Sequence, residues 1–229
     1  MMLSKHPVVR LWPWVITALV ALLAAGSLRA EPRAAEKWVE RTGCRLADDR
    51  FADGDSFGLE WRDTKGGDVK RTYRLYGVDC PESDAGDKVL ERRIQEQMDA
   101  FGTDRPTLLR FGREAARFSA RLLRNGKVRI LTRGALGQEV PKQSGRPQRR
   151  YAMVEVIDAT GKPRWLHELL LEAGLARAYG EPVAWPPKEE DRHGGKAAAQ
   201  AFRRELDNLE RLARSRKAGI WGAEKWKAP

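Results

Sequence analysis

The stretch RTYRLYGVDCPES, residues 71–83, places Arg74 inside an apolar run that is typical of a β-strand, and the run ends abruptly on Asp-Cys-Pro-Glu. Two acids, Asp79 and Glu82, follow the run directly, and the proline between them favours an extended backbone at Cys80. The stretch therefore brings one guanidinium and two carboxylates together at the point where a strand ends, and the neighbouring segments indicate why.

The segment before this stretch has the pattern of a partner strand. Residues 55–61 alternate in the period of a half-buried strand. The loop at 62–68 holds two glycines, which predicts a hairpin leading into a second strand over 70–78. In such an antiparallel pair, Asp55 at the start of one strand and Asp79 at the end of the other lie at the same end of the sheet.

The rest of the chain adds helices and two further strands. Apolar side chains recur with helical spacing from Leu108 to Leu122 and again from Phe202 to Ala213. Strand patterns occur at 127–133 and 150–158, and a further helix is expected to end near Gly174. Because the strands are mostly sequential and joined by hairpins, we expect an α+β fold with an antiparallel sheet or small barrel.

Composition indicates a basic, globular protein. A chain of 229 residues with 41% hydrophobic and 33% charged residues is long enough for one domain with its own core. We expect that domain over residues 43–225, after a lead-in at 31–42. The net charge of +11 favours a polyanionic partner, either nucleic acid, anionic lipid or acidic polymer. Charge alone does not choose among them, and a basic surface that only keeps the protein soluble is the alternative.

Residues 1–30 have the order of features that defines a signal peptide. A short basic segment precedes the apolar stretch LWPWVITALVALLAAGSL, and the following SLRA-EP offers a small-residue cleavage site. The prediction is an exported protein, periplasmic or secreted. The apolar stretch is about 18 residues long, so an uncleaved segment that anchors the protein in the membrane stays the alternative.

The chain contains only two cysteines, Cys44 and Cys80. Two cysteines cannot form a zinc site alone, and in an exported protein two cysteines often pair. The sequence leaves both states open: a Cys44–Cys80 disulfide or two buried free thiols.

The two aspartates predict a site for a hard divalent cation. Asp55 is in phase with Phe57, so it points to the inner face of its strand, at the rim. Two like charges at Asp55 and Asp79 repel unless a cation or a proton lies between them. Ca²⁺ or Mg²⁺ prefers carboxylate and carbonyl oxygens, so the carbonyl of Cys80 is a third candidate ligand, and Asp53 is placed to support the site.

Arg74 and Glu82 complete a candidate catalytic set. A carboxylate beside a metal-bound water can act as a general base, and a guanidinium fits a phosphate oxygen. Metal ion and guanidinium together would stabilise the pentacoordinate state of a phosphodiester. Each residue also has a plainer reading: Arg74 as an ion-pair partner of Asp79, Glu82 as a helix cap or surface acid, and 53–55 as an ordinary turn.

Several motifs, in this order, resemble the staphylococcal nuclease (thermonuclease) family. They are DGDSF at 53–57, RLYGVDCPE at 74–82, FGREAARF at 111–118, RRYAMVEV at 149–156, HELLLEAGLARAYG at 167–180 and AGIWG at 218–222. The resemblance implies a five-stranded antiparallel OB-fold-like β-barrel with about three packed helices. It also implies Ca²⁺-dependent hydrolysis of phosphodiester bonds in DNA and/or RNA, with little sequence preference and 3′-phosphate products.

The resemblance assigns roles to individual residues. The family's aspartate ligands fall on Asp55 and Asp79, and its carbonyl ligand falls on Cys80. Its first catalytic arginine falls on Arg74 and its catalytic glutamate on Glu82. The second catalytic arginine falls on Arg149, counted from Ala152, but the usual approach to it is replaced by SGRPQRR, so Arg146 and Arg150 compete for this role.

Two features depart from or extend the family pattern. The segment at about 84–107 is longer than is typical by roughly one helix, and we expect it to be an inserted helical segment that covers part of the site. By family analogy, Tyr179 is expected to pack against a base or sugar. The resemblance implies no stable protein partner and a monomer.

Other readings of the same residues remain. A small barrel with a basic groove can bind single-stranded nucleic acid without cleaving it, so a non-catalytic binding module is the alternative function. Three histidines, with His167 expected on a helix surface or partly packed, leave no paired-His nuclease site. The sequence holds no Walker loop and no GxSxG motif.

Overall fold

The computed structural model describes residues 38–47, 53–84, 88–124, 127–134, 139–140, 148–158, 160–180, 183 and 195–224. The expected signal segment at 1–30 and the candidate Arg146 lie outside these residues. Within them, no helix is both long enough and apolar enough to cross a membrane.

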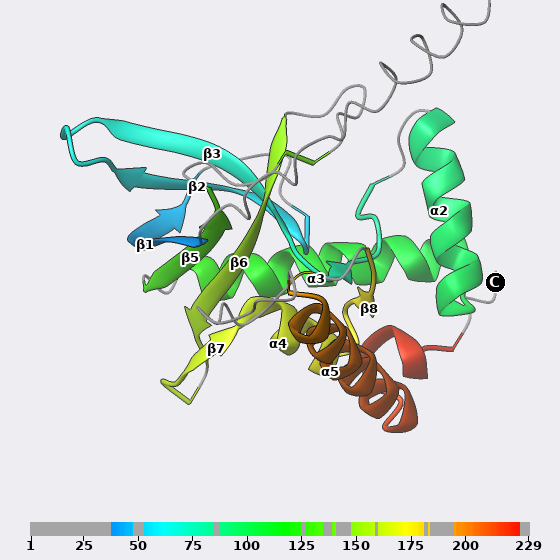
Figure 1. Cartoon of the computed structure of the whole chain (residues 1–229). Coiled ribbons are helices and arrows are strands. Elements are labelled where there is room, and N and C mark those ends of the chain that lie inside the picture. Colours follow the sequence, from blue (N-terminus) through cyan, green and yellow to red (C-terminus); the bar gives the residue numbers. More distant parts are fainter. Residues whose placement is uncertain are drawn as a thin grey trace, which may run out of the picture. The chain divides into compact units, whose positions relative to one another are not determined.

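Five of the strands close into a barrel (Figure 1). The sheet has the order β3-β2-β1-β5-β6-β7, and an additional pairing of β3 with β6 closes it. The strands are β1 (Trp38–Leu46), β2 (Ser56–Arg62), β3 (Asp68–Leu75), β5 (Val128–Arg133), β6 (Arg149–Ile157) and β7 (Pro163–Trp165).

The barrel is mixed rather than antiparallel throughout. β3 and β6 pair in parallel, whereas the other pairings in this sheet are antiparallel. The expectation of a purely antiparallel barrel was wrong at this seam for a topological reason. Strand direction cannot alternate all the way around a closed ring with an odd number of strands, so at least one neighbouring pair must be parallel.

The first strand begins earlier than expected. β1 starts at Trp38, so residues 38–42 of the expected lead-in belong to the barrel, with a bulge between Arg41 and Cys44. The Trp38 ring meets the Tyr76 ring edge-on at a centroid distance of 6.0 Å. This contact anchors the beginning of the strand to the barrel.

The predicted hairpin is confirmed, but its second strand is shorter. Ser56 pairs with Arg74, which fixes the register between β2 and β3. β3 then ends at Leu75, and the chain bends at Tyr76 and Gly77 before the short strand β4 (Val78–Asp79). β4 leaves the barrel sheet and pairs with β8 (Arg177–Ala178).

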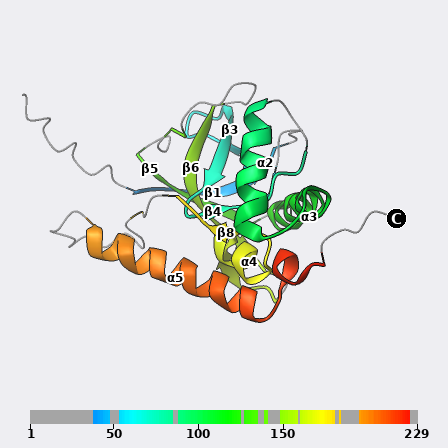
Figure 2. The same cartoon turned by 90° about the vertical axis from the view of Figure 1, so that its right-hand side faces the viewer.

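Among the described residues, four α-helices and a short 3₁₀ helix lie beside and below the barrel (Figure 2), which agrees with the expected three helices and one inserted helix. The helices are α2 (Lys88–Phe101), α3 (Arg105–Arg124), α4 (Leu166–Glu172), α5 (Lys196–Ser215) and η1 (Gly219–Gly222). α2 lies in the segment where the sequence predicts an inserted helix. α3 packs against β1, β6 and α2, while α4 packs against β6 and α5.

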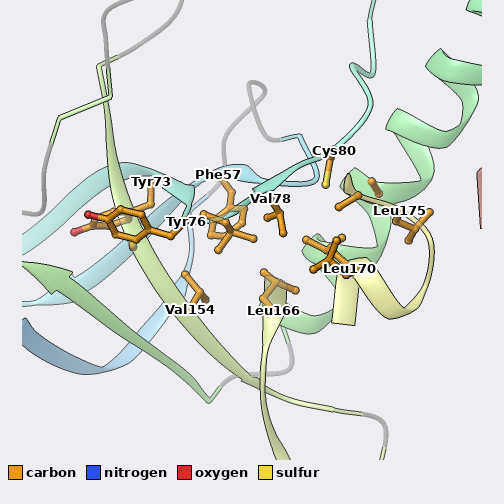
Figure 3. Packing of buried hydrophobic residues seen from close by; sticks show 14 of the residues in the cluster. Phe57, Tyr73, Tyr76, Val78, Cys80, Val154, Leu166, Leu170 and Leu175 are labelled. Atoms are coloured by element: carbon orange, nitrogen blue, oxygen red, sulfur yellow. The ribbon is translucent and has the colours of Figure 1, made fainter. Parts of the chain in front are cut away.

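A single hydrophobic core runs from the barrel interior to the helices. Phe57 and Val154 lie in its barrel half, and Leu166 and Leu170 extend it through α4 (Figure 3). His167 is part of this interior and is only 1% exposed, so its expected surface position was wrong. Burial lowers the pKa of His167 to about 3, so the imidazole is neutral in the folded protein.

Both cysteines are buried free thiols in the structure, so the disulfide is not formed there. Cys44 lies in β1 opposite Val128, whereas Cys80 lies in the loop after β4 and approaches Gly54. Burial raises the pKa of the Cys44 thiol to about 11 and that of the Cys80 thiol well above its ordinary value. Both side chains therefore act as small apolar groups in the core.

Candidate active site

Arg74 joins the two predicted aspartates at one end of the barrel. Its Nη1 donates to Asp55 Oδ1 at 3.0 Å, and its Nη2 donates to Asp79 Oδ1 at 2.8 Å. All three side chains are buried. Asp55 precedes β2, Arg74 lies near the end of β3 and Asp79 lies in β4. The hairpin register brings Asp55 and Arg74 together, and the bend after β3 with the short strand β4 brings Asp79 to them, so the three residues meet as the sequence predicts.

The charges of this group depend on one another. Burial alone would lower the pKa of Arg74, but Asp55 and Asp79 outweigh it and raise that pKa above its ordinary value. Burial alone would raise the pKa of Asp79, but the charges of Arg93, Arg74 and Arg177 lower it below its ordinary value. Both ionised forms are therefore stable without exposure to water.

The DGD turn aims Asp55 at Arg74. Asp53 Oδ1 accepts the N–H groups of Asp55 at 3.2 Å and Ser56 at 2.7 Å, so Asp53 forms the turn that the plainer reading describes. The second carboxyl oxygen of Asp55 accepts the N–H of Cys80 at 2.8 Å. One carboxylate thus ties the turn before β2 to the loop after β4.

Helix α3 holds both of these segments in place. Ser119 Oγ donates to the carbonyl of Gly54 at 2.6 Å. A Cβ at Gly54 would come within 2.7 Å of Cys80 Sγ, and a Cβ at Gly112 would overlap the carbonyl of Glu82. Only glycine at these two positions lets the turn, the loop and the helix approach so closely.

Helix α2 adds two residues that sequence analysis missed. Arg93 forms ion pairs with both Glu82 and Asp79. One turn later, Gln97 Nε2 donates to Asp79 Oδ2 at 3.0 Å and to the Cys80 carbonyl at 2.9 Å, while its Oε1 accepts the N–H of Glu82 at 2.9 Å. The inserted helix is therefore part of the site.

A third arginine reaches Asp79 from β8. Arg177 Nε donates to Asp79 Oδ2 at 3.0 Å, and its Nη2 donates to Glu96 at 2.7 Å. The Arg177 guanidinium also lies over the ring of Tyr179, 4.5 Å from its centroid. Tyr179 is 37% exposed, so it presents an aromatic surface beside the site. We call Asp55, Asp79, Glu82, Arg74, Arg93 and Arg177 the acid–arginine cluster.

Of the two described candidates for the second catalytic arginine, Arg149 and Arg150, it is Arg149 that points to the cluster. Its Nη1 donates to Ser56 Oγ at 3.1 Å, and that hydroxyl donates to Asp55 Oδ1 at 2.9 Å. Arg149 is buried, whereas the next residue, Arg150, pairs with Glu139 in an exposed contact. The alternation along β6 thus points Arg149 toward the site, while its catalytic role stays a prediction.

The predicted cation ligands are occupied by donors of the chain itself. A carboxylate offers about four acceptor positions, and Asp79 accepts from Arg74, Arg93, Arg177 and Gln97. The Cys80 carbonyl accepts from Gln97. In the described part of the chain, no group of three or more His, Cys, Asp or Glu side chains is placed to hold a metal ion. As arranged, these residues do not fit a divalent cation.

The fold is an OB-like barrel of the staphylococcal nuclease type, and the acid–arginine cluster lies at one end of it. The sequence profile of the family described as Staphylococcal nuclease homologue matches residues 72–223. The chain therefore belongs to this family. The match includes most of the acid–arginine cluster, and Asp55 lies before it. A search of curated protein sequences finds no match to the chain.

Sequence analysis missed Arg93, Gln97 and Arg177. These residues lie on α2 and β8, and no local sequence pattern marks any of them as functional. The helical segment itself was expected at about 84–107, and the i, i+4 spacing of Arg93 and Gln97 places them on one helix face. Nothing in the sequence says that this face meets Asp79, because the contact depends on how α2 packs.

Proposed function

We propose that the protein is an exported nuclease that hydrolyses phosphodiester bonds of DNA and/or RNA with low sequence specificity. One observation carries the proposal: Arg74 joins Asp55 and Asp79 beside Glu82, at one end of a barrel that belongs to a nuclease-type family. A structural ion pair alone would explain Arg74 with one aspartate. It does not explain why Glu82 and Arg149 converge there too.

In the proposed reaction, Glu82 is the general base. Its carboxylate takes a proton from a water molecule, and the water oxygen forms a new bond to phosphorus. The bond from phosphorus to the 5′ oxygen breaks, and that oxygen takes a proton from solvent. The products are a 3′-phosphate and a 5′-hydroxyl. Glu82 is nearly buried and is held by Gln97 through its own N–H, so its position is fixed before substrate arrives.

Arg74 and Arg149 neutralise the phosphate in this proposal. A phosphodiester carries one negative charge, which increases on the equatorial oxygens as the water attacks. Guanidinium groups already fixed by carboxylate and hydroxyl partners need no rearrangement when that charge develops. Removing one such donor from an active site typically costs about 3–4 kcal/mol of transition-state stabilisation.

The surface of α3 supports a polyanionic substrate. Five arginines spaced by 3, 4, 4 and 3 residues lie on one exposed stripe of this helix: Arg110, Arg113, Arg117, Arg121 and Arg124. The same helix contacts the loop after β4, residues 80–84, which we call the catalytic loop, because Arg113 Nη1 donates to the Ser83 carbonyl at 3.3 Å. A basic stripe that begins at the site fits a nucleic-acid backbone, and Tyr179 offers a stacking surface for a base.

The stripe gives the proposal a test that is separate from chemistry. For a single strand, the slope of log affinity against log salt changes by about 0.7 for each phosphate that the protein no longer neutralises. Arg117→Ala combined with Arg121→Ala should therefore flatten the slope by about 1.4 in a titration with labelled oligonucleotide. A slope equal to that of the wild type would remove the stripe from the substrate path.

Export, and calcium or another divalent ion as cofactor, stay predictions of the sequence. Export is tested by expressing the full chain in a bacterium and sequencing the N-terminus of the protein released from the cell envelope. A new N-terminus near residue 31 supports cleavage, whereas an intact N-terminus in the membrane fraction supports the anchor. The resemblance to the staphylococcal nuclease family also implies a monomer, and light scattering tests this prediction.

The experiment for the main proposal is hydrolysis of plasmid DNA, a single-stranded oligonucleotide and RNA by the purified protein. Each substrate is incubated with Ca²⁺, with Mg²⁺ and with EDTA, beside the Glu82→Gln variant. We expect cleavage by the wild type and at least about 10²-fold slower cleavage by the variant. Binding without cleavage under all three conditions would instead support the non-catalytic binding module.

A further inference from the structure

The contacts between α2 and the catalytic loop fill the space that a cation would need. Arg93 pairs with Asp79 and Glu82, and its side chain is only 17% exposed. Gln97, four residues later on the same helix face, binds Asp79 and the Cys80 carbonyl. Two adjacent side chains of one helix therefore engage an expected cation ligand, an expected carbonyl ligand and the proposed general base.

The charges of the acid–arginine cluster and of its nearest charged partners balance. Asp55, Asp79 and Glu82 contribute −3, and Arg74, Arg93 and Arg177 contribute +3. Beside them, Glu96, which pairs with Arg177, is offset by Arg149, which Ser56 joins to Asp55. The carboxylates of the cluster would need a metal cation only if no other positive charge lay between them. A divalent ion added to this arrangement would leave an excess of two positive charges in a buried site.

We propose that Arg93 takes the place of the divalent cation beside Asp79, where it bridges to Glu82 while Arg74 bridges Asp79 to Asp55, so that phosphodiester hydrolysis by this protein requires no divalent metal ion. This inference rests on the proposed function. A guanidinium is permanently charged and carries five N–H donors in a fixed plane. The contacts to Asp79 and Glu82 use two of them, which leaves donors for a phosphate oxygen.

The hydrogen bonds of Gln97 stabilise the arrangement in which Arg93 replaces the divalent cation. The Cys80 carbonyl and the Glu82 N–H would each lose a partner if α2 moved away. An arriving ion would also have to displace Arg93 and leave that guanidinium partly buried without its carboxylates. Leaving a buried charge unpaired is strongly unfavourable, so Ca²⁺ has little to gain from entering the site while Arg93 is present.

The position of Arg93 also links it to the reaction. Its Nε donates to Glu82 Oε1 and its Nη2 donates to Asp79 Oδ1, so it lies between the proposed base and the pair held by Arg74. A phosphate bound between Arg74 and Arg93 would face Glu82. Arg93 is then a ligand of the substrate phosphate as well as a counter-charge for the two carboxylates.

The test combines thermal unfolding with cleavage assays, each with EDTA and with millimolar Ca²⁺. For the wild type we expect the same Tm and the same cleavage rate under both conditions. For Arg93→Met we expect at least about 10²-fold slower cleavage in EDTA. The variant should also gain a Ca²⁺-dependent rise in Tm of about 5 °C or more, because the two carboxylates then lack a counter-charge.

Arg92→Met is the matched control, because Arg92 is the exposed neighbour on α2. It should behave like the wild type in every assay. Arg93→Lys keeps the charge and serves if Arg93→Met does not fold; it should retain more cleavage in EDTA than a neutral side chain. An Arg93→Met protein that folds, cleaves at the wild-type rate in EDTA and gains no Ca²⁺-dependent shift would overturn the inference.

The outcomes separate this inference from the proposed function. A wild type that cleaves only with Ca²⁺, or whose Tm rises with Ca²⁺, overturns the inference and leaves the nuclease intact. A wild type that cleaves nothing under any condition overturns the proposed function. In that case the Tm values of the wild type and of Arg93→Met still decide whether Arg93 replaces the cation.

Discussion

The barrel side and the α2 side of the acid–arginine cluster are built by different kinds of structure. On the barrel side, Asp55 and Arg74 meet because one hairpin sets the register of two strands, and Asp79 joins them from the short strand that follows the hairpin. On the α2 side, Arg93 and Gln97 lie on the inserted helix α2, whose position is not set by strand pairing. The first arrangement follows from local periodicity, and the second depends on tertiary packing alone.

The two sides also contribute differently to function. The barrel side holds the residues that the family resemblance assigns to catalysis. The α2 side changes the electrostatics around them, because Arg93 supplies a positive charge beside Asp79, an aspartate that the resemblance assigns to the metal ion. In our proposal, an inserted element thus alters the cofactor requirement of a site while its catalytic residues stay in place.

The largest effect should come from the barrel side. Arg74→Lys keeps a positive charge but cannot donate to Asp55 and Asp79 through two separate nitrogens of a plane. We expect kcat/KM to fall by a factor that corresponds to about 3 kcal/mol or more. Steady-state cleavage of a labelled oligonucleotide measures this effect.

Arg150→Lys on β6 is the control for that measurement, because Arg150 pairs with Glu139, which is outside the cluster. Its kcat/KM should stay within about twofold of the wild type. A near-normal rate for Arg74→Lys would show that Arg74 is only a structural partner of the aspartates, and the two sides would no longer differ in function.

A smaller effect is expected where α3 supports the catalytic loop. Gly112→Ala places a methyl group against the carbonyl of Glu82, which is backbone and cannot turn aside. We expect a loss of about 2 kcal/mol in the free energy of unfolding, together with slower cleavage. Urea unfolding measures the first and the oligonucleotide assay the second.

Glu114→Ala, on the exposed face of the same helix, is the matched control and should change neither quantity appreciably. An unchanged Gly112→Ala variant would mean that α3 and the loop can separate without cost. The close approach would then have no role in fixing Glu82.

The sequence made the barrel side predictable for physical reasons. Asp55 has the same phase as the buried Phe57, and the glycine-containing loop sets the hairpin, so the approach of Asp55 to Arg74 at the end of β3 follows from strand geometry. The parallel seam between β3 and β6 was missed because sequential hairpins say nothing about how a barrel closes. Arg93 and Gln97 were missed because a helix pattern shows which residues share a face but not what that face meets.

His167 shows the same limit in the core, away from the cluster. Its helix pattern does not reveal that α5 covers it, with the Phe202 ring edge-on at 5.4 Å. Its folded pKa of about 3 lies below the ordinary value of 6.5, so the unfolded chain binds the extra proton. The contribution of the neutral His167 to the free energy of unfolding is therefore fully present above about pH 6.5, and it is lost as the pH falls toward the folded pKa.

This burial predicts a pH effect that a substitution removes. Between pH 7.5 and pH 5, we expect the free energy of unfolding to fall by about 2 kcal/mol in the wild type from His167 alone. In His167→Leu that part of the fall should vanish. Urea unfolding of both proteins at the two pH values measures the difference, and parallel pH dependence in the two proteins would contradict the buried neutral imidazole.

The most direct test of the catalytic role of the cluster is the effect of Glu82→Gln on hydrolysis of a labelled single-stranded oligonucleotide, with Tm measured on the same samples. The substitution keeps the size of the side chain and removes the carboxylate that would accept the proton from water. We predict at least about 10²-fold slower cleavage, with the variant still folded. A folded variant that cleaves at close to the wild-type rate would contradict the claim that the cluster at the end of this barrel is the catalytic centre.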